Sequence, residues 1–503
     1  MRPARDTPRR AMPRAFAQDV CLPENELFPP DAPVQYVPRA PVPDSALTAE
    51  DWAEDRAFPR ALYRLALPIV LQSLLSAAVS AADVLMLAYV NPSALSATSL
   101  AGQVTFVLTL FFMGICTGVM ILGAQYWGQK DLEAIEKIQG CALRNAGIVS
   151  LLFFLAALLL PQQLMRLFTP DPALIALGAA YLRVVGFSFL CMGASQVFLA
   201  TLKSIERTKV SALISSACLL VNVAGNALAI FVVYPREPAL AVQGVAGATV
   251  AARMAELLLC VLWFARHRML RLRIQHVLRT EGWLRKRCWQ CALPVQANYL
   301  IWGGALTVTS ALMGHVSAEM IAASAIALSV RNLATVACTG LSNGGSILLG
   351  KHLGARRMAL ARRDGEKLRR WALLLGALAG LLLLLARPLA LRMGGVHGQT
   401  RQLLDGMLFI CACQCVGKAY NATLVAGVFA AGGDTRFGLA CDTVVMWGLV
   451  LPLGYLFAFV LKAPPLLIFC VLCLDEYIKM PIVARRFRRY LWLQNLTIHR
   501  KEG

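Results

Sequence analysis

Charged side chains are scarce in this chain and make up 15% of its 503 residues, whereas soluble domains carry about 25%. Acidic residues are the scarcer kind, with 28 Asp and Glu against 49 Lys and Arg, which gives a net charge of +21. Hydrophobic residues supply 58% of the chain, and the mean hydropathy is +0.61. A chain with so few charges cannot cover its apolar surface in water, so the composition predicts a polytopic membrane protein.

Residues for catalytic or metal chemistry are also few. The six histidines fall almost entirely in loops, which argues against a histidine-based membrane enzyme. The 15 cysteines are scattered through apolar runs, where thiols behave as small hydrophobic groups. Cys288 and Cys291 form a lone Cys-x-x-Cys pair without the second pair that a zinc site needs. We therefore expect no enzyme activity, no disulfide framework, no metal centre and no cofactor.

Apolar runs long enough to cross the ~30 Å of bilayer hydrocarbon recur along the chain. There are twelve of them, at 62–90, 97–124, 141–161, 173–201, 210–234, 242–265, 290–314, 319–349, 371–391, 402–430, 437–461 and 464–483. Runs of this length and apolarity are typical of transmembrane helices. The predicted fold is all-α, with twelve transmembrane helices.

The basic residues between these runs predict the orientation. If both termini are cytoplasmic, nearly all loop Lys and Arg lie on the inner side, as the positive-inside rule requires. The excess of positive charge then reflects topology and contact with anionic membrane lipid, and we expect no nucleic-acid partner. The predicted location is the cell membrane, with many passes and both termini inside.

Three segments lie outside the predicted helical bundles: one precedes them, one joins them and one follows them. Residues 1–58 are rich in Pro and Arg and have no apolar h-region of a signal peptide, so we expect a disordered cytoplasmic extension. The predicted bundles are 59–265 and 290–484. A basic cytoplasmic linker at 266–289 joins them, and 485–503 form a basic cytoplasmic tail.

The two bundles repeat each other in sequence. One constant offset along the chain places Pro68 on Pro294 and Ala97 on Ala323. The same offset, which we call the repeat register, matches three pairs of glycines: Gly114 with Gly340, Gly118 with Gly344 and Gly128 with Gly354. Since six helices is an even number, both halves enter the membrane from the same side, which predicts parallel, pseudo-symmetric repeats around a central cavity. Such bundles commonly carry solutes by rocking between inward- and outward-open forms.

A transporter needs a driving force. Gly345–His352 resembles a phosphate-binding loop, but His352 replaces the Ser or Thr that holds magnesium, so we do not expect nucleotide binding. An ion gradient therefore remains as the expected driving force. Asp83 is the one acid in the first apolar run, and a membrane-buried carboxylate can exchange protons or ligate sodium. A structural acid hydrogen-bonded to neighbouring helices is the alternative.

Other polar residues inside the apolar runs extend this hypothesis. Asn222 and Asn226 share a helix face and can either line a polar pocket with Asp83 or bridge helices. Arg253 and Glu256 are spaced as a self-neutralising structural pair. In the second half, the candidates for substrate binding are Asn298, Tyr299, Trp302, Arg331, Asn421 and Asp442. An unpaired Arg331 would be costly, so we expect a partner such as Asp442, Glu319 or an anionic substrate.

Several segments resemble the multidrug and toxic compound extrusion (MATE) family over residues 60–497. They are LALPIVLQSLL, SAADVLMLAYV, GAQYWGQKDLEA, PVQANYLIWGG, GGSILLGKHLGARR and AAGGDTRFGLACDTVVMWGLVLPL. The tail from Arg486-Phe487 to Leu496-Thr497 is similar to that of a bacterial branch of the family.

The resemblance implies export of organic cations and amphipathic drugs in exchange for protons or sodium, by a monomer working through alternating access. It also implies that Asp83 is the coupling acid and that Asn222 and Asn226 complete its site. Tyr299 stands where many relatives carry a glutamate, so the resemblance leaves open whether the second half has an ion site.

Other functions remain as alternatives. The nearest is a flippase for a lipid-linked precursor from the same superfamily, which would favour a strongly basic cavity. A membrane enzyme would need clustered His, Asp or Ser within the helices. A channel fits a two-fold repeat with a buried acid less well than alternating access does.

Overall fold

The computed structural model describes residues 47–497 apart from 91, 235–236, 271–272, 279–281 and 394–396. Every regular element among them is a helix. The N-terminal half contains α1 (Ala49–Val90), α2 (Pro92–Gly128), α3 (Leu132–Leu159), α4 (Pro161–Arg166), α5 (Pro172–Ser204), α6 (Thr208–Ala227), η3 (Leu228–Val233) and α7 (Pro238–His267). The C-terminal half contains α8 (Ile274–Leu278), α9 (Gly282–Val316), α10 (Ala318–Ala334), α11 (Val336–Gly354), α12 (Met358–Met393), α13 (Gly398–Asn421), η4 (Ala422–Phe429), α14 (Thr435–Asp442), η5 (Thr443–Val450), α15 (Leu451–Tyr455), η6 (Leu456–Val460), α16 (Pro465–Leu472) and α17 (Asp475–Arg488). The all-α class predicted from the sequence is confirmed.

Each of the twelve apolar runs falls on one helix or on consecutive helices. By length and composition, nine helices of the described residues can span a membrane. The bent pair α10 and α11, which meet at 46°, makes a tenth if the two are one span. The chain is thus a multi-pass membrane protein, and the count of twelve spans stays a prediction.

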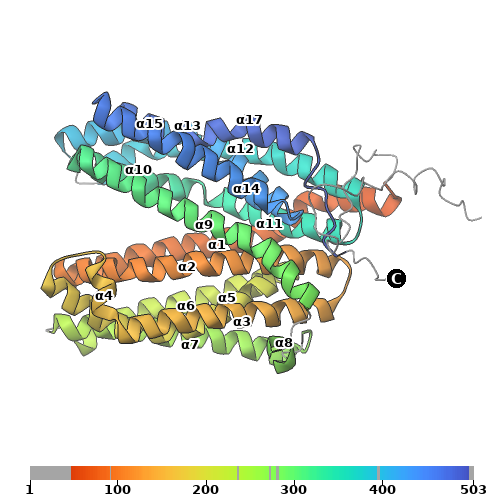
Figure 1. Cartoon of the computed structure of the whole chain (residues 1–503), viewed down its shortest axis with the longest axis horizontal. Coiled ribbons are helices and arrows are strands. Elements are labelled where there is room, and N and C mark those ends of the chain that lie inside the picture. The colour runs from red at the N-terminus through yellow and green to blue at the C-terminus, as the bar shows by residue number, and fades with distance from the viewer. Residues whose placement is uncertain are drawn as a thin grey trace, which may run out of the picture.

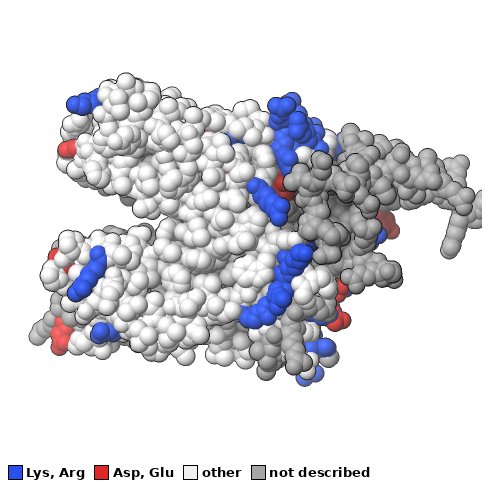
Figure 2. All heavy atoms as spheres, in the orientation of Figure 1, with Lys and Arg blue, Asp and Glu red and all other residues white. Residues whose placement is uncertain are grey.

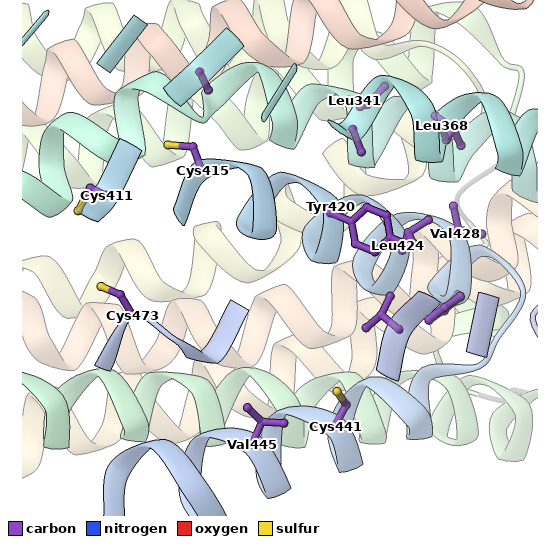
Figure 3. Packing of buried hydrophobic residues seen from close by; sticks show 14 of the residues in the cluster. Leu341, Leu368, Cys411, Cys415, Tyr420, Leu424, Val428, Cys441, Val445 and Cys473 are labelled. Carbon is purple, nitrogen blue, oxygen red and sulfur yellow. The ribbon is translucent and has the colours of Figure 1, made fainter. Parts of the chain in front are cut away.

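The helices form two bundles, and Figure 1 shows the earlier helices below the later ones. In the first bundle α2, α3, α5 and α7 pack around one apolar core, with α6 against α1 and α7. In the second, α13 packs against α10 and α12, and η4 packs against α11. Cys411 and Cys415 lie within this second core, where both are fully buried (Figure 3). These thiols pack as small apolar groups, as the sequence predicted.

The bundles meet through glycines that follow the repeat register. A Cβ atom on Gly354 would lie 1.8 Å from the carbonyl oxygen of Gln125. A Cβ on Gly128 would lie 2.0 Å from the carbonyl oxygen of Lys351, which is the counterpart of Gln125 in that register. Only glycine lets the two backbones approach so closely. The repeat is therefore visible as a pair of equivalent contacts between the bundles.

A further pair of contacts follows the same register. A Cβ atom on Gly118 would lie 2.9 Å from the Ala292 side chain, and one on Gly344 would lie 3.3 Å from the backbone of Ala66. Ala292 and Ala66 are again counterparts in the repeat register. The contacts of α2 with α9 and of α11 with α1 are thus the same contact made twice. This confirms parallel repeats related by a pseudo-two-fold axis.

The bundles touch at one end and separate at the other. Figure 2 shows a notch between them at the end away from most of the Lys and Arg side chains visible in that view. We call the end where Gly128 and Gly354 meet the closed end. The notch lies between the two bundles, where the repeat predicts a central cavity.

Two helices begin outside the predicted bundles, and the predicted tail is partly packed against the protein. The helix α1 begins at Ala49, before the predicted end of the N-terminal extension, and α9 begins at Gly282, inside the predicted linker. The tail is not simply a solvated segment, since Trp492 and Leu493 are fully buried. Polar and charged residues at these places hid the helical and packed structure from a hydropathy reading. Residues 1–46 of the predicted extension lie outside the described residues.

Candidate functional site

A polar cluster lies inside the N-terminal bundle around Asp83. The side-chain amide of Asn226 donates a hydrogen bond of 2.8 Å to Oδ1 of Asp83. Nδ2 of Asn226 also lies 3.5 Å from Oδ1 of Asn222, and the side-chain amide of Asn222 donates to the hydroxyl of Thr249 over 3.2 Å. The three residues that the sequence grouped therefore do meet, and Thr249 of α7 joins them. Thr249 was missed because a single threonine in an apolar helix gives no signal of its own.

The local sequence explains how these side chains meet. Asn222 and Asn226 are four residues apart on α6, so both face the same neighbour. The preceding part of α1 is rich in Ser and Ala, whose small side chains let α6 and α1 pack closely. Asn226 is 2% exposed, whereas Asp83 is half-buried. The carboxylate thus sits between a buried amide and a more open region.

The cluster offers oxygen atoms that suit a small cation. Oδ1 of Asn226 is buried and has no hydrogen-bond partner among the described residues. Carboxylate, amide and hydroxyl oxygens are the ligands that hard cations prefer. A proton on Asp83 would alternatively donate a hydrogen bond to such an oxygen. The residues present therefore fit either coupling ion.

A second polar group in this bundle is fully neutralised. Arg253 donates to Oε2 of Glu256 over 2.9 Å. Glu256 is 1% exposed and also accepts from the hydroxyls of Ser195 at 2.8 Å and Ser215 at 3.4 Å. The predicted pairing of Arg253 with Glu256 is confirmed. Because its partners come from several helices, this acid can hold α5, α6 and α7 together.

The C-terminal bundle contains a larger polar network. Lys479 of α17 pairs with Asp442 of α14 at 2.7 Å and with Asp475 at 3.6 Å. The side-chain amide of Asn421 donates to the backbone oxygen of Glu476 at 2.7 Å and to its carboxylate at 2.8 Å. Asp442, one of the three partners that the sequence suggested for Arg331, pairs with Lys479 instead. Lys479 reaches Asp442 because α17 packs against α13 and η5. The sequence alone does not reveal this packing, so it could not predict the ion pair.

Arg331 and Lys418 form a cationic pair in the same bundle. The guanidinium of Arg331 donates to the side-chain oxygen of Gln414, and Lys418 donates to Oδ1 of Asn332 over 2.9 Å. Gln414 in turn donates to Asp475 over 3.2 Å. Gln414, Asp475, Glu476 and Lys479 were not among the predicted site residues. The last three interrupt the final apolar run, which was the signal that could have found them.

The predicted polar and aromatic face of α9 is divided between two surroundings. Tyr299 packs against the apolar core of the N-terminal bundle. Trp302 is 38% exposed, and Oδ1 of Asn298 is buried without a hydrogen-bond partner among the described residues. The reason is that α9 crosses α2, where Gln296 donates to the backbone oxygen of Leu110 at 3.3 Å.

The closed end is held by hydrogen bonds from the C-terminal tail. Gln125 of α2 donates to the backbone oxygen of Ala431 over 2.7 Å and accepts from the backbone N–H of Leu496 over 2.7 Å. Asn495 donates to the backbone oxygen of Leu353 over 2.8 Å. Lys351 pairs across the bundles with Glu206 at 3.0 Å. The tail therefore ties both bundles together.

A run of acids at the start of α1 also reaches the C-terminal bundle. We call Glu50, Asp51, Glu54 and Asp55 the acidic segment. At 42 residues, α1 is about 63 Å long, so this segment lies outside the ~30 Å hydrocarbon. Asp55 pairs with Lys367 at 2.6 Å and with Arg363 at 3.2 Å, both on α12.

His352, beyond the predicted membrane span of α11, lies between two carboxylates. It is 2.6 Å from Asp364 and 3.3 Å from Glu54. Burial alone would lower the pKa of His352, but the hydrogen bonds with Asp364 and Glu54 outweigh it and raise the pKa to about 9. The hydrogen bond from His352 is also the main reason that the pKa of Glu54 falls to about 2. An imidazolium thus joins the bundles at neutral pH.

Comparison with known proteins agrees with this architecture. The family model MatE matches the chain twice, at residues 68–228 and 295–456. An uncharacterized transporter of Bacillus subtilis, YisQ, is 22% identical over 444 residues, which cover 88% of this chain and 96% of the relative. A probable multidrug resistance protein NorM of Bradyrhizobium diazoefficiens is 24% identical over 417 residues, covering 79% of this chain and 86% of that protein.

Solved structures share the fold. An outward-facing multidrug resistance MATE transporter of the MOP superfamily superposes with a TM-score of 0.78 at 15% identity, covering 86% of this chain and 95% of that one. A variant of the Vibrio cholerae MATE transporter VcmN gives a TM-score of 0.80 at 16% identity, covering 88% and 99%. The two-lobed arrangement of the helices is therefore shared with both.

Proposed function

Because this chain belongs to the MatE family, whose members are membrane transporters rather than enzymes, we propose that it is a secondary-active antiporter. In this proposal it exports organic cations or amphipathic drugs in exchange for protons or sodium, by alternating access. The names of the NorM relatives as multidrug resistance proteins support this substrate class. Small molecules of this kind are its partners, together with the membrane lipid around a monomer.

One observation supports the coupling mechanism above the others. Asp83 accepts a 2.8 Å hydrogen bond from Asn226, and the unbonded oxygen of that buried amide lies in the same cluster of described residues. A carboxylate in a low-dielectric site has a strong preference for a bound proton or cation. When Asp83 is occupied, its charge is neutralised and the N-terminal bundle can rearrange around it. When it is empty, its negative charge attracts a cationic substrate.

The contacts at the closed end suggest how access alternates. Gly128 and Gly354 bring α2 and α11 together at the basic end of the molecule, while the notch opens at the other end. The positive-inside rule assigns the basic end to the cytoplasm, so this conformation is outward-open. Export then requires that the same contacts part to admit substrate from inside. The proposed location is the cell membrane, with both termini in the cytoplasm.

The test is transport by the Asp83→Asn variant in everted vesicles. We expect gradient-driven export of a cationic dye to fall by at least about tenfold, because an amide can neither lose a proton nor carry the negative charge that holds sodium. Glu319→Gln is the matched control, since Glu319 is an exposed acid at the start of α10. Unchanged export by Asp83→Asn, with normal insertion, would remove Asp83 from the mechanism.

The coupling ion follows from a second measurement. Collapsing the proton gradient and the sodium gradient in turn should stop export in one case and spare it in the other. If neither treatment affects export, secondary transport itself is refuted.

A further inference from the structure

Arg331 and Lys418 lie side by side on two neighbouring helices. Arg331 is adjacent to Asn332 on α10, and Gln414 and Lys418 are one turn apart on α13. The two hydrogen bonds, Arg331 to Gln414 and Lys418 to Asn332, are therefore separated by about one helical pitch of ~5.4 Å. Two positive charges are thus held close together within a membrane-spanning bundle.

In the described part of the chain, no ion pair joins Arg331 or Lys418 to a carboxylate. The acids nearest to them are engaged elsewhere. Asp442 and Asp475 pair with Lys479, and Glu476 binds Asn421. Nε of Arg331 is buried without a hydrogen-bond partner among the same residues. Three cations, Arg331, Lys418 and Lys479, thus share this network with three acids, but of these cations only Lys479 has an ion pair among the described residues. A cation inside a membrane protein without an ion pair is costly, so Arg331 and Lys418 favour a further anion.

The pair borders a face of α10 that carries a stripe of small and polar residues. This stripe consists of Ala318, Ala322, Ala325, Ser329 and Asn332, all exposed, and the exposed Ile321 and Leu333 flank it. On α12 the exposed residues are long and apolar: Leu374, Leu378, Leu381, Leu382, Leu385 and Leu389. Lipid tails favour the second pattern, and a hydrated cavity favours the first. Arg331 and Lys418 are each partly exposed and can therefore meet a solute.

We propose that Arg331 and Lys418 bind an anionic group, such as a carboxylate, on the transported solute. The preferred substrates are then zwitterionic amphiphiles, with a cationic part and an acidic part, rather than simple organic cations. This inference rests on the proposed export function and specifies its substrate class. Arg331 supplies a planar guanidinium and Lys418 a mobile ammonium, and together they can hold both oxygens of a carboxylate.

Gln414 and Asn332 are positioning residues in this site. Gln414 accepts from Arg331 and donates to Asp475, so it fixes the guanidinium without neutralising it. Asn332 accepts from Lys418 in the same way. Because amides rather than carboxylates hold the two side chains, no ion pair within the site competes with the solute for them.

The test compares a zwitterionic fluoroquinolone with its ethyl ester, which differs only in lacking the free carboxylate. Equilibrium binding to the purified full chain and export from proteoliposomes are both measured. We expect the wild-type protein to bind the acid more tightly than the ester. Arg331→Gln and Lys418→Gln should each weaken binding of the acid by about tenfold or more and that of the ester by less than about twofold.

Control variants separate the site from folding and from general charge. Arg331→Lys keeps the positive charge and should retain a preference for the acid. Arg392→Gln removes an arginine at the far end of α12 and should change neither ligand. Equal loss of both ligands in Lys418→Gln, or equal wild-type binding of acid and ester, overturns the inference.

Two further outcomes locate any failure. Export of the ester alone, unaffected by either glutamine variant, leaves the antiporter proposal intact and refutes the anion site. Export of neither compound refutes the proposed function, while the binding comparison still tests the site. If adding phosphatidylglycerol to the proteoliposomes abolishes the preference for the acid, a lipid headgroup is the anion, and the inference about the solute is wrong.

Discussion

Asp83 in the first bundle corresponds, in the repeat register, to Thr309, and Arg331 in the second corresponds to Thr105 in the first. The acid therefore has no counterpart in the C-terminal bundle, and the arginine has none in the N-terminal bundle. The contacts between the bundles are nevertheless duplicated, glycine for glycine. The repeat has kept the backbone packing while the charges inside the two bundles have diverged.

The deeper polar groups show how far this divergence goes. Arg253 and Lys479 are basic residues on the last helix of their bundles, α7 and α17. Each basic residue pairs with an acid of its own bundle, but the acid is Glu256 in one case and Asp442 in the other. A cation on the last helix of each bundle is thus a shared structural device. Asp83 and the pair of Arg331 and Lys418 are the parts specific to one bundle.

The largest expected effect tests this structural device. Lys479→Met leaves the partly buried Asp442 and Asp475 without their cation, which should destabilise the protein by roughly 3–5 kcal/mol. Arg253→Met should cost less, because Glu256 keeps its hydrogen bonds from Ser195 and Ser215. Thermal unfolding in detergent measures both. Equal losses would mean that the two cations are equivalent after all.

A smaller effect tests the symmetry of the glycine contacts. Gly354→Ala and Gly128→Ala each place a Cβ atom within 2.0 Å of a backbone oxygen of the other bundle. Each should weaken the closed end by about 1–3 kcal/mol, and by similar amounts, since backbone cannot rotate away. The rate of cross-linking between cysteines engineered on the two sides of the closed end measures how far this contact is weakened. Gly147→Ala is the control, because its Cβ would meet nothing within 4 Å; an effect confined to one of the two glycines would break the symmetry.

The starts of the equivalent helices α1 and α9 differ in charge. The acidic segment lies at the start of α1, whereas Arg285, Lys286 and Arg287 lie near the start of α9.

The smallest expected effect concerns the contact between the acidic segment and His352. The pKa of His352 is raised from 6.5 to about 9. The stabilisation from its ion pairs is therefore fully present below pH 6.5 and is lost as the pH rises through 9. The pKa of Glu54 is lowered from 4.5 to about 2, so the stabilisation that Glu54 contributes is fully present above pH 4.5 and is lost as the pH falls towards 2. The contact should therefore be strongest between about pH 4.5 and 6.5.

Unfolding temperature against pH measures this contact. The wild-type protein should lose stability between about pH 6.5 and 9, and His352→Gln should lose less over the same range. The groups that face His352 are Glu54 of α1 and Asp364 of α12, with Arg357 beside Glu54. An identical alkaline decline in both proteins would assign it to other groups.

The amino-acid sequence determined the helical class, the repeat and much of the coupling cluster. Apolar length identifies helices because a bilayer leaves the backbone no other partner than itself. Glycines in the repeat register mark the contact between the bundles, and the i, i+4 spacing of Asn222 and Asn226 places both on the face that meets Asp83. These signals are local or periodic, so they can be read along the chain.

Only the tertiary structure decided which charges are neutralised. Lys479 takes Asp442, Gln414 separates Arg331 from Asp475, and Glu54 reaches His352 from the opposite half of the chain. Each choice depends on which helices are neighbours and on distances of a few ångströms, which no spacing in the sequence encodes. That packing leaves an acid in one bundle and two cations in the other without an ion pair among the described residues.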